Sequence, residues 1–199
     1  MSKDLEKMSV AELWQLFPII LREHNPAYQQ WYDQQAQVLR QTFGVSVLRI
    51  NHIGSTAVSN LVAKPCVDIL LELAHGWDQQ QIITETRAAG WLLMSAESTP
   101  LKLVFNQGYT DHGFVEKVFH LHVRRLGDWD ELYFRDYLLT HPEVARDYAA
   151  LKRNLAEKFT HNRDAYTEAK TEFIAGMTTL ARAEFGPRYA VNEKTHPDL

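Results

Sequence analysis

The segment that decides the fold is "NHIGSTAVSNLVAKPCVDILLEL", residues 51–73. A Gly-Ser-Thr turn separates an aliphatic run ending at Ile53 from a second apolar run, residues 65–73, and both runs are typical of β-strands. The second run is apolar enough for the centre of a sheet, yet it contains Asp68. A buried acid costs free energy unless it binds a cation or pairs with a base. Asp68 is therefore either a site residue, a salt-bridge partner of a base such as Lys64, or a strand-end acid facing solvent.

The patterns on either side of this segment predict an α+β chain. Apolar runs and alternation predict strands, a 3.6-residue period predicts helices, and Gly, Pro and Asx residues mark the boundaries. The strands are expected at 17–23 (an edge strand), 45–54, 65–73, 91–95, 101–106 and 116–126, with turn residues at 108–113. The helices are expected at 9–16, 25–43, 77–90, 128–140 with Asp128 as its cap, 141–159 and 162–185.

This order of elements divides the chain into a sheet-forming part and a helical part. We predict an N-terminal helix or extension over 1–17 and one domain over 18–185. Within that domain, residues 18–127 form the sheet core and residues 128–185 the helical part. The polar tail, 186–199, is expected to be loose.

The composition is that of a globular protein. Of 199 residues, 45% are hydrophobic and 23% charged, and the net charge of −4 argues against a general nucleic-acid-coating role but leaves a local basic groove open. The one cysteine, Cys66, excludes an internal disulfide and a cysteine-built zinc site, and its strand favours a buried, inert thiol. The sequence lacks a signal peptide and an apolar run of about 20 residues, so we expect a cytoplasmic protein without a membrane partner.

Two pairs of residues on strands are candidates for chemistry. Side chains alternate along a strand, so Asp68 shares a face with Leu70 and Glu72. His120 and His122 likewise share one face of their strand, where two imidazoles can contact a metal or a phosphate. Alternatively, they are half-buried histidines with ordinary hydrogen bonds.

The helical part carries two Tyr/Lys pairs at the same spacing, Tyr148 with Lys152 and Tyr166 with Lys170. Residues four apart share a helix face. Lysine can contact a phosphate, and tyrosine can stack on a base or bond to a ribose. In the alternative interpretation, each tyrosine packs in the core and each lysine is solvated. Nothing in the sequence matches an RNA-recognition motif.

The ordered motifs "HIGSTAV", "DILLEL", "HLHV", "FRDYLLTHPEVARDYAALKRNLA" and "AYTEAKTEFI" resemble the GrpB family, from about residue 17 to about residue 181. That family has a nucleotidyltransferase-like fold, so the resemblance implies a mixed sheet with flanking helices and a C-terminal helical segment. In active nucleotidyltransferases a Gly-Ser turn after the first core strand holds a nucleotide triphosphate. Two acids spaced by one residue on the next strand, and a third acid on a later strand, hold two Mg²⁺ ions.

Mapped onto this chain, the resemblance places Gly54 and Ser55 in the turn and Asp68 at the first acid position. The second acid position is Leu70, which cannot bind a metal. Glu72 lies about 13 Å beyond Asp68, at about 3.3 Å per residue along a strand. The later acid position is taken by a histidine. The resemblance thus implies Asp68, His120 and His122 as catalytic and metal residues. One carboxylate with imidazoles suits Mn²⁺ or Zn²⁺ better than a pair of Mg²⁺ ions.

We therefore expect a protein that binds a nucleotide or phosphorylated metabolite, with metal-dependent nucleotidyl transfer as the activity. The alternatives are a non-catalytic nucleotide-sensing or interaction module, a metal-dependent phosphohydrolase, and a phosphate site without metal. The residues expected to bind the ligand are Gly54, Ser55, Thr56, Lys64, Tyr148, Lys152, Tyr166 and Lys170.

Overall fold

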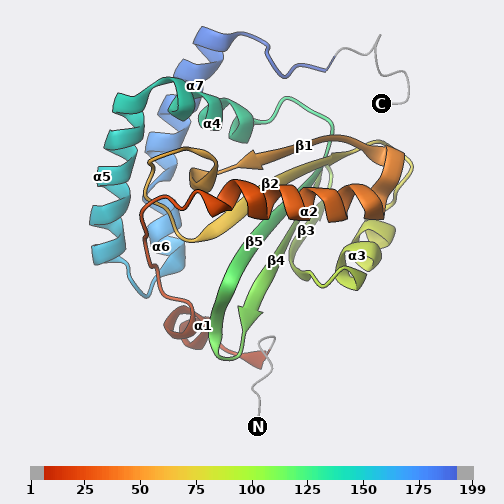
Figure 1. Ribbon diagram of the computed structural model, residues 1–199, viewed down its shortest axis with the longest axis horizontal. Coiled ribbons are helices and arrows are strands. Elements are labelled where there is room, and N and C mark those ends of the chain that lie inside the picture. The colour runs from red at the N-terminus through yellow and green to blue at the C-terminus, as the bar shows by residue number, and fades with distance from the viewer. Residues whose placement is uncertain (1–6, 192–199) are drawn as a thin grey trace.

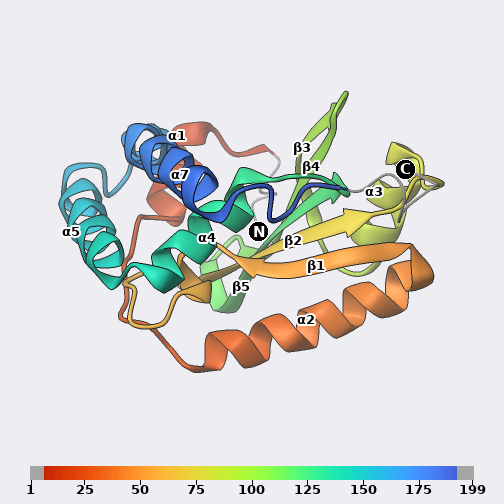
Figure 2. The same cartoon turned by 90° about the horizontal axis from the view of Figure 1, so that it is seen from above.

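The computed structural model describes residues 7–191 and contains a five-stranded mixed sheet with helices on both faces (Figures 1 and 2). The strand order is β1-β2-β5-β4-β3; only β2 and β5 pair in parallel, and the other neighbours are antiparallel. The strands are β1 (Val47–Ile53), β2 (Cys66–Leu73), β3 (Leu92–Ser98), β4 (Leu101–Thr110) and β5 (Gly113–Arg125). The predicted α+β class is confirmed.

Seven α-helices and two short 3₁₀ helices surround this sheet within the described residues. The α-helices are α1 (Val10–Leu16), α2 (Ala27–Phe43), α3 (Gln79–Ala88), α4 (Asp130–Thr140), α5 (Pro142–Lys158), α6 (Arg163–Glu168) and α7 (Thr171–Phe185). The 3₁₀ helices are η2 (Gly44–Ser46) and η3 (Ser55–Ala57). None of the helices between residues 7 and 191 is long and apolar enough to cross a membrane.

The two faces of β2 pack against different helices, because its side chains alternate. Val67, Ile69 and Leu71 are fully buried in the main core together with residues of α2 and α3. Leu70 lies on the other face and packs against Leu132 of α4. In Figure 2, α2 runs along one side of the sheet, and α4 and α7 lie on the opposite side. Asp68 therefore faces the C-terminal helices.

The edge strand predicted at 17–23 is wrong. This segment forms only an isolated bridge between Arg22 and Ala63. The Ile19 side chain packs against Leu155 and Tyr166 of the helical part, and its amide donates to the Thr160 carbonyl. The apolar side chain of Ile19 is thus buried by packing against helices and not by strand pairing. This tertiary contact cannot be predicted from the local sequence pattern.

The turn predicted at 108–113 is mostly strand. Gly108, Tyr109 and Thr110 belong to β4, and the chain reverses only at Asp111 and His112. Gly108 has φ +90° at a register shift between β4 and β5. Its glycine signal marks a bulge rather than a loop.

Two predicted helix boundaries are also wrong. The helix expected at 162–185 is divided into α6 and α7, and the break leaves the Lys170 ammonium 4.3 Å from the Tyr166 ring centroid. Asp128 does not cap α4, which begins after Trp129. The Asp128 carboxylate instead accepts a 2.7 Å hydrogen bond from Arg182 of α7.

The first residues of the C-terminal tail, which was predicted to be loose, make defined contacts. Gly186, with φ +61°, ends α7 as expected. After it, Arg188 pairs with Asp136 at 2.9 Å, and the Tyr189 hydroxyl donates to the same carboxylate at 2.5 Å. The remainder of the predicted tail, 192–199, and the first six residues of the predicted N-terminal extension lie outside the described residues.

Glu72 is a structural acid rather than a second metal ligand. Its side chain is fully buried, and its carboxylate receives two hydrogen bonds from Arg49, at 2.5 and 2.6 Å. The Gly127 amide donates to it at 3.0 Å. Removing one member of a buried pair leaves the other charge uncompensated. We expect Glu72→Gln to lower the free energy of unfolding by about 3–5 kcal/mol in urea denaturation.

The matched control is Glu23→Gln, because Glu23 pairs with Arg153 at 3.0 Å with both side chains exposed. Exposed ion pairs contribute roughly 0–1 kcal/mol. A Glu72→Gln loss no larger than that of Glu23→Gln would contradict the structural role of Glu72.

Candidate functional site

The Gly54–Ser55 turn follows β1 and lies against Asp68 of β2. Gly54 has φ +69°, and a Cβ built on it would lie 3.0 Å from Asp68 Cγ and closer still to Oδ2. Glycine is thus required both by the backbone angle and by the close approach of the carboxylate. The sequence singled out this turn, and the reason for its glycine is the contact with Asp68.

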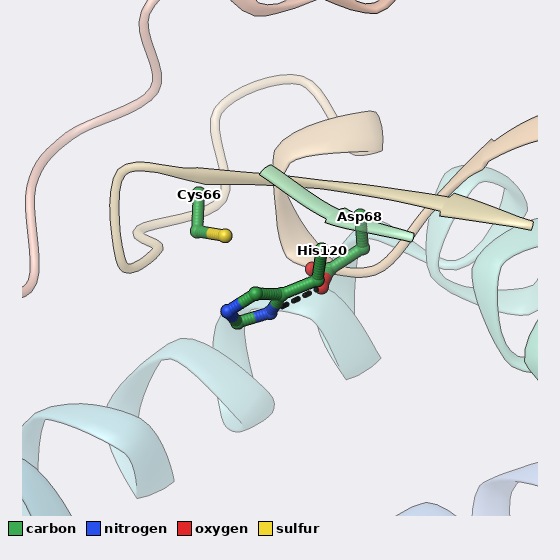
Figure 3. Close-up of side chains that lie close together, drawn as sticks. All are labelled: Cys66, Asp68 and His120. Carbon is green, nitrogen blue, oxygen red and sulfur yellow. Dashed lines mark hydrogen bonds and ion pairs between the residues drawn. The ribbon is translucent and has the colours of Figure 1, made fainter. Parts of the chain in front are cut away.

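The parallel pairing of β2 with β5 brings together the three residues predicted to be catalytic. Asp68 is in register with His120, and its Oδ1 lies 3.0 Å from His120 Nδ1 and 3.9 Å from His122 Nε2. In Figure 3 the Asp68 carboxylate and the His120 ring face one another. Among the described residues these histidines, and not Lys64, are the basic groups within 4.0 Å of Asp68.

The environment of the pair lowers both the pKa of Asp68 and the pKa of His120. Burial alone would raise the pKa of Asp68, but hydrogen bonds and charge from His120 and His122 outweigh burial and hold the pKa well below its usual range. Burial lowers the pKa of His120. When neutral His120 donates its Nδ1–H to Asp68, its Nε2 accepts from the Tyr109 hydroxyl, 2.7 Å away. A carboxylate that orients an imidazole in this way prepares it to act as a base.

Lys152 of α5 reaches the Gly-Ser turn. Its ammonium donates to Ser55 Oγ at 2.9 Å and also to the Val62 carbonyl, and the residue is only 2% exposed. The ammonium lies 4.6 Å from the Tyr148 ring centroid. Burial, and then the charge of Lys170, lowers the pKa of Lys152 to about 7. The first predicted Tyr/Lys pair thus lies at the predicted turn.

The second Tyr/Lys pair lies close to a third lysine. The ammonium groups of Lys170 and Lys64 are 4.3 and 5.8 Å from the Tyr166 ring centroid. Burial, and then the charge of Lys64, lowers the pKa of Lys170 to about 8. Tyr166 and Tyr148 are 1% and 4% exposed, so their rings support the lysines from within the core instead of offering open faces to a base.

Thr56, predicted to bind ligand, instead connects the turn to β2. Its hydroxyl is buried and donates to the Cys66 carbonyl at 3.2 Å. It also accepts from His52 Nε2 at 2.9 Å. Burial lowers the pKa of His52 to about 4, so this histidine is neutral near pH 7. Thr56 therefore fixes the position of the turn by hydrogen bonds to β1 and β2.

A cleft of about 630 Å³ opens beside the turn. Gly54, Ser55, Asp68, His122 and Tyr148 line it, whereas Lys64, Lys152, Tyr166, Lys170 and His120 are not among its lining residues. The rest of the cleft wall carries both signs of charge. Its positive residues are Lys102, Arg124 and Arg182, and its negative residues are Asp128, Asp130 and Glu131.

Arg124 and Thr178 are two of the cleft residues that sequence reasoning missed. Both are nearly buried, at 6% and 5% exposed, and Arg124 Nε and Thr178 Oγ1 have no hydrogen-bond partner within the described part of the chain. Buried polar atoms normally have partners. Alternation could have indicated Arg124, which follows His120 and His122 on the same face of β5.

Cys66 is a further residue that sequence reasoning left out of the site. Its sulfur, an Asp68 oxygen and a His120 nitrogen lie within 4.8 Å of one another, and all three side chains extend to the same side of the two strands (Figure 3). Burial raises the pKa of the Cys66 thiol, so metal binding would have to displace its proton. This mixed set of donors suits a transition metal such as Zn²⁺.

The residues present do not fit a pair of Mg²⁺ ions. Leu70, at the second acid position, is fully buried against Ile53 and Leu132. Glu72 is occupied by Arg49. Among the described residues, Asp68, His120 and Cys66 form a group whose donor atoms are close enough to hold one metal, and His122, also predicted as a ligand, is not part of that group.

Comparison with known proteins agrees with this architecture. The GrpB protein family matches residues 18–179. The chain is 36% identical over 160 residues to the UPF0157 protein PA4798 of Pseudomonas aeruginosa, covering 80% of this chain and 66% of that protein. It is 34% identical over 160 residues to the glutamate-rich protein GrpB of Alkalihalophilus pseudofirmus, covering 78% of this chain and 91% of that protein.

A solved structure supports the same assignment. The crystal structure of the conserved protein GrpB from Enterococcus faecalis superposes with a TM-score of 0.68 at 26% identity, covering 83% of this chain and 99% of that one. Among the sequence relatives, the UPF0157 protein YqkA of Bacillus subtilis is longer, and the match spans 48% of its length. Because the family match covers most of the chain and the relatives from Pseudomonas aeruginosa and Alkalihalophilus pseudofirmus are 36% and 34% identical to it, this chain belongs to the GrpB family, also described as UPF0157.

Proposed function

We propose that this protein binds a phosphate-bearing ligand, a nucleotide or a phosphorylated metabolite, in the cleft at the Gly54–Ser55 turn. The observation that carries the proposal is the buried ammonium of Lys152, which donates to Ser55 Oγ at 2.9 Å without a carboxylate within 4.0 Å among the described residues. An uncompensated buried cation is costly. An anion at the turn would offset that cost.

The charges around the turn support the same ligand class. Lys170 is likewise without a carboxylate within 4.0 Å in the described part of the chain, and Asp68 is the acid whose charge acts on both Lys152 and Lys170. Whereas the wall of the cleft itself carries both signs of charge, these two lysines thus share the charge of one acid. Such a local excess recruits multiply charged anions.

The reaction that fits these groups best is metal-dependent nucleotidyl transfer. A metal held by Asp68, His120 and Cys66 would supply neutralisation of phosphate charge. The chain's own groups would do the rest: Ser55 and Lys152 orient the phosphates, and His122, which lines the cleft beside Asp68 and is not one of the three metal ligands, accepts the proton of an attacking hydroxyl. Lys170 would offset charge on the leaving phosphates.

A specific observation also favours a second candidate, a non-catalytic nucleotide-sensing module. Leu70 is fully buried where an active nucleotidyltransferase carries its second acid. A site without that acid keeps its phosphate contacts but has fewer metal ligands. This candidate implies ligand binding without turnover.

The binding test is a thermal-shift screen of ATP, the other nucleoside triphosphates and inorganic tripolyphosphate, with and without Mg²⁺, Mn²⁺ or Zn²⁺, followed by calorimetry. We expect binding that Lys152→Met weakens by about tenfold or more, since a charge-assisted hydrogen bond contributes about 1.5–3 kcal/mol. The control is Lys158→Met, an exposed lysine on the same helix. Absence of any shift with all these probes would overturn the proposal.

The pH dependence of affinity gives a second readout of the same test. Below pH 7 Lys152, with its pKa of about 7, is already protonated in the free protein and affinity is full. A bound anion raises this pKa, so above pH 7 binding must take up a proton, and affinity falls by up to about tenfold per pH unit. Lys170, Arg153, Lys64 and Asp68 also act on Lys152. The profile of Lys152→Met, subtracted from that of the wild type, isolates its contribution.

A further inference from the structure

A second cavity, of about 560 Å³, lies on the other side of the Asp68–His120 pair. Its walls come from the end of α1, residues 17–25, the start of α2 and the β4–β5 hairpin. Three of its aromatic rings contact one another: Phe17 lies 4.8 Å from Tyr109 and 5.0 Å from Phe114, and Tyr109 lies 5.1 Å from Phe114, between ring centroids. Such a wall suits an apolar or aromatic ligand body.

Two partly buried cations line the same cavity without an acidic partner, and a third cation of the lining, Arg22, is exposed. Lys64 and Arg163 have no carboxylate within 4.0 Å among the residues that the structure describes. Arg163 Nη2 lies 3.4 Å from His120 Nε2, which also lines the cavity. The acids of the lining, Glu23 and Glu116, are exposed, whereas Lys64 and Arg163 are partly buried. The charge beside the apolar wall is thus positive and uncompensated.

The cavity and the cleft at the Gly-Ser turn meet at one hydrogen bond. His120 lines the cavity, Asp68 lines the cleft, and the two side chains are joined at 3.0 Å. A ligand on each side would therefore approach the same Asp-His pair from opposite directions. A small molecule in this cavity, distinct from the phosphate ligand of the cleft, would thus lie next to the imidazole of His120.

We propose that this cavity binds a small amphiphile: an apolar or aromatic body with one anionic group, a carboxylate or a phosphate ester. The body lies against Phe17, Tyr109 and Phe114, and the anionic group lies at Lys64 and Arg163. The site goes beyond the phosphate-binding cleft, and it stands or fails independently of the function proposed above.

The test uses two fluorescent probes that share one ring system. 1-Anilinonaphthalene-8-sulfonate carries an anionic group and N-phenyl-1-naphthylamine does not. We expect the folded protein to bind the sulfonate at least about tenfold more tightly, because a charged partner adds a charge-assisted contact. 1-Naphthoate and 1-naphthyl phosphate, added as competitors, distinguish a carboxylate site from a phosphate-ester site.

Variants locate the probe. Arg163→Met and Lys64→Met should reduce the affinity for the sulfonate about tenfold and leave that for the neutral probe unchanged. Phe114→Asp, at a partly exposed position, should weaken both probes. Lys102→Met alters the other cleft and should change neither. Equal affinity for the two probes would overturn the proposal, and so would an equal effect of Lys102→Met and Arg163→Met on the affinity for the sulfonate. Circular dichroism verifies that each variant is folded.

Discussion

Gly54→Ala is expected to lower the free energy of unfolding by about 2–6 kcal/mol and to abolish ligand binding at the turn. The first cause is the backbone: Gly54 has φ +69° and ψ −170°, a region that is essentially restricted to glycine and where a Cβ costs about 1–3 kcal/mol. The second is overlap with the Asp68 carboxylate, since the new Cβ would lie 3.0 Å from Cγ and closer to Oδ2. Overpacking of this kind costs about 1–3 kcal/mol. Urea denaturation measures the total.

Two controls separate these causes. Gly44 also has a positive φ, +55°, but a Cβ there would meet nothing within 4 Å, so Gly44→Ala carries backbone strain alone. In a double-mutant cycle, Asp68→Ala should recover most of the additional cost of Gly54→Ala, because it removes the atoms that overlap. If Gly54→Ala costs the same with and without Asp68, the contact with the carboxylate is not the cause.

Asp68→Asn is expected to lower affinity for Zn²⁺ or Mn²⁺ by at least about 100-fold, because an amide is a weaker ligand and no longer receives a charge-assisted hydrogen bond from His120. The same change removes the negative charge that acts on Lys152 and Lys170. Metal-free tripolyphosphate should therefore bind as tightly as to the wild type or more tightly. Metal analysis of the purified variant and calorimetry with both ligands measure the two effects.

This experiment also separates the two proposed functions. If the protein is a metal-dependent nucleotidyltransferase, Asp68→Asn should abolish turnover and metal-dependent nucleotide binding. If it is a non-catalytic module, nucleotide affinity should be insensitive to metal in both proteins. Asp130→Asn is the control, because Asp130 lines the same cleft but is 68% exposed and pairs with Arg182. Unchanged metal affinity in Asp68→Asn would exclude Asp68 as a ligand.

The sequence by itself determined the elements whose patterns are strongest. The apolar run of residues 65–73 predicted a strand. Because side chains alternate along a strand, this prediction placed Ile69 and Leu71 on one face and Asp68 and Leu70 on the other, and the structure has the main core on the first face and Leu70 packed on the second. The start of the first helix near residue 9 and the end of the last helix before Gly186 were also predictable from sequence. Both depend on neighbours a few residues away: in the structure Ser9 and Glu12 form a capping box, and Gly186 ends α7 with a positive φ. These are local effects, so local sequence is sufficient.

Only the tertiary structure decided which residues meet at the site. Ser55 and Lys152 are 97 residues apart, and Asp68 and His120 are 52 apart, so their contacts depend on helix packing and on the parallel register of β2 with β5. The same register brings Cys66 close to Asp68 and His120. No short segment of the sequence predicts either this register or the two cavities. Burial then sets the pKa of Lys152, because desolvation depends on everything that surrounds the ammonium and not on the residues next to it in sequence.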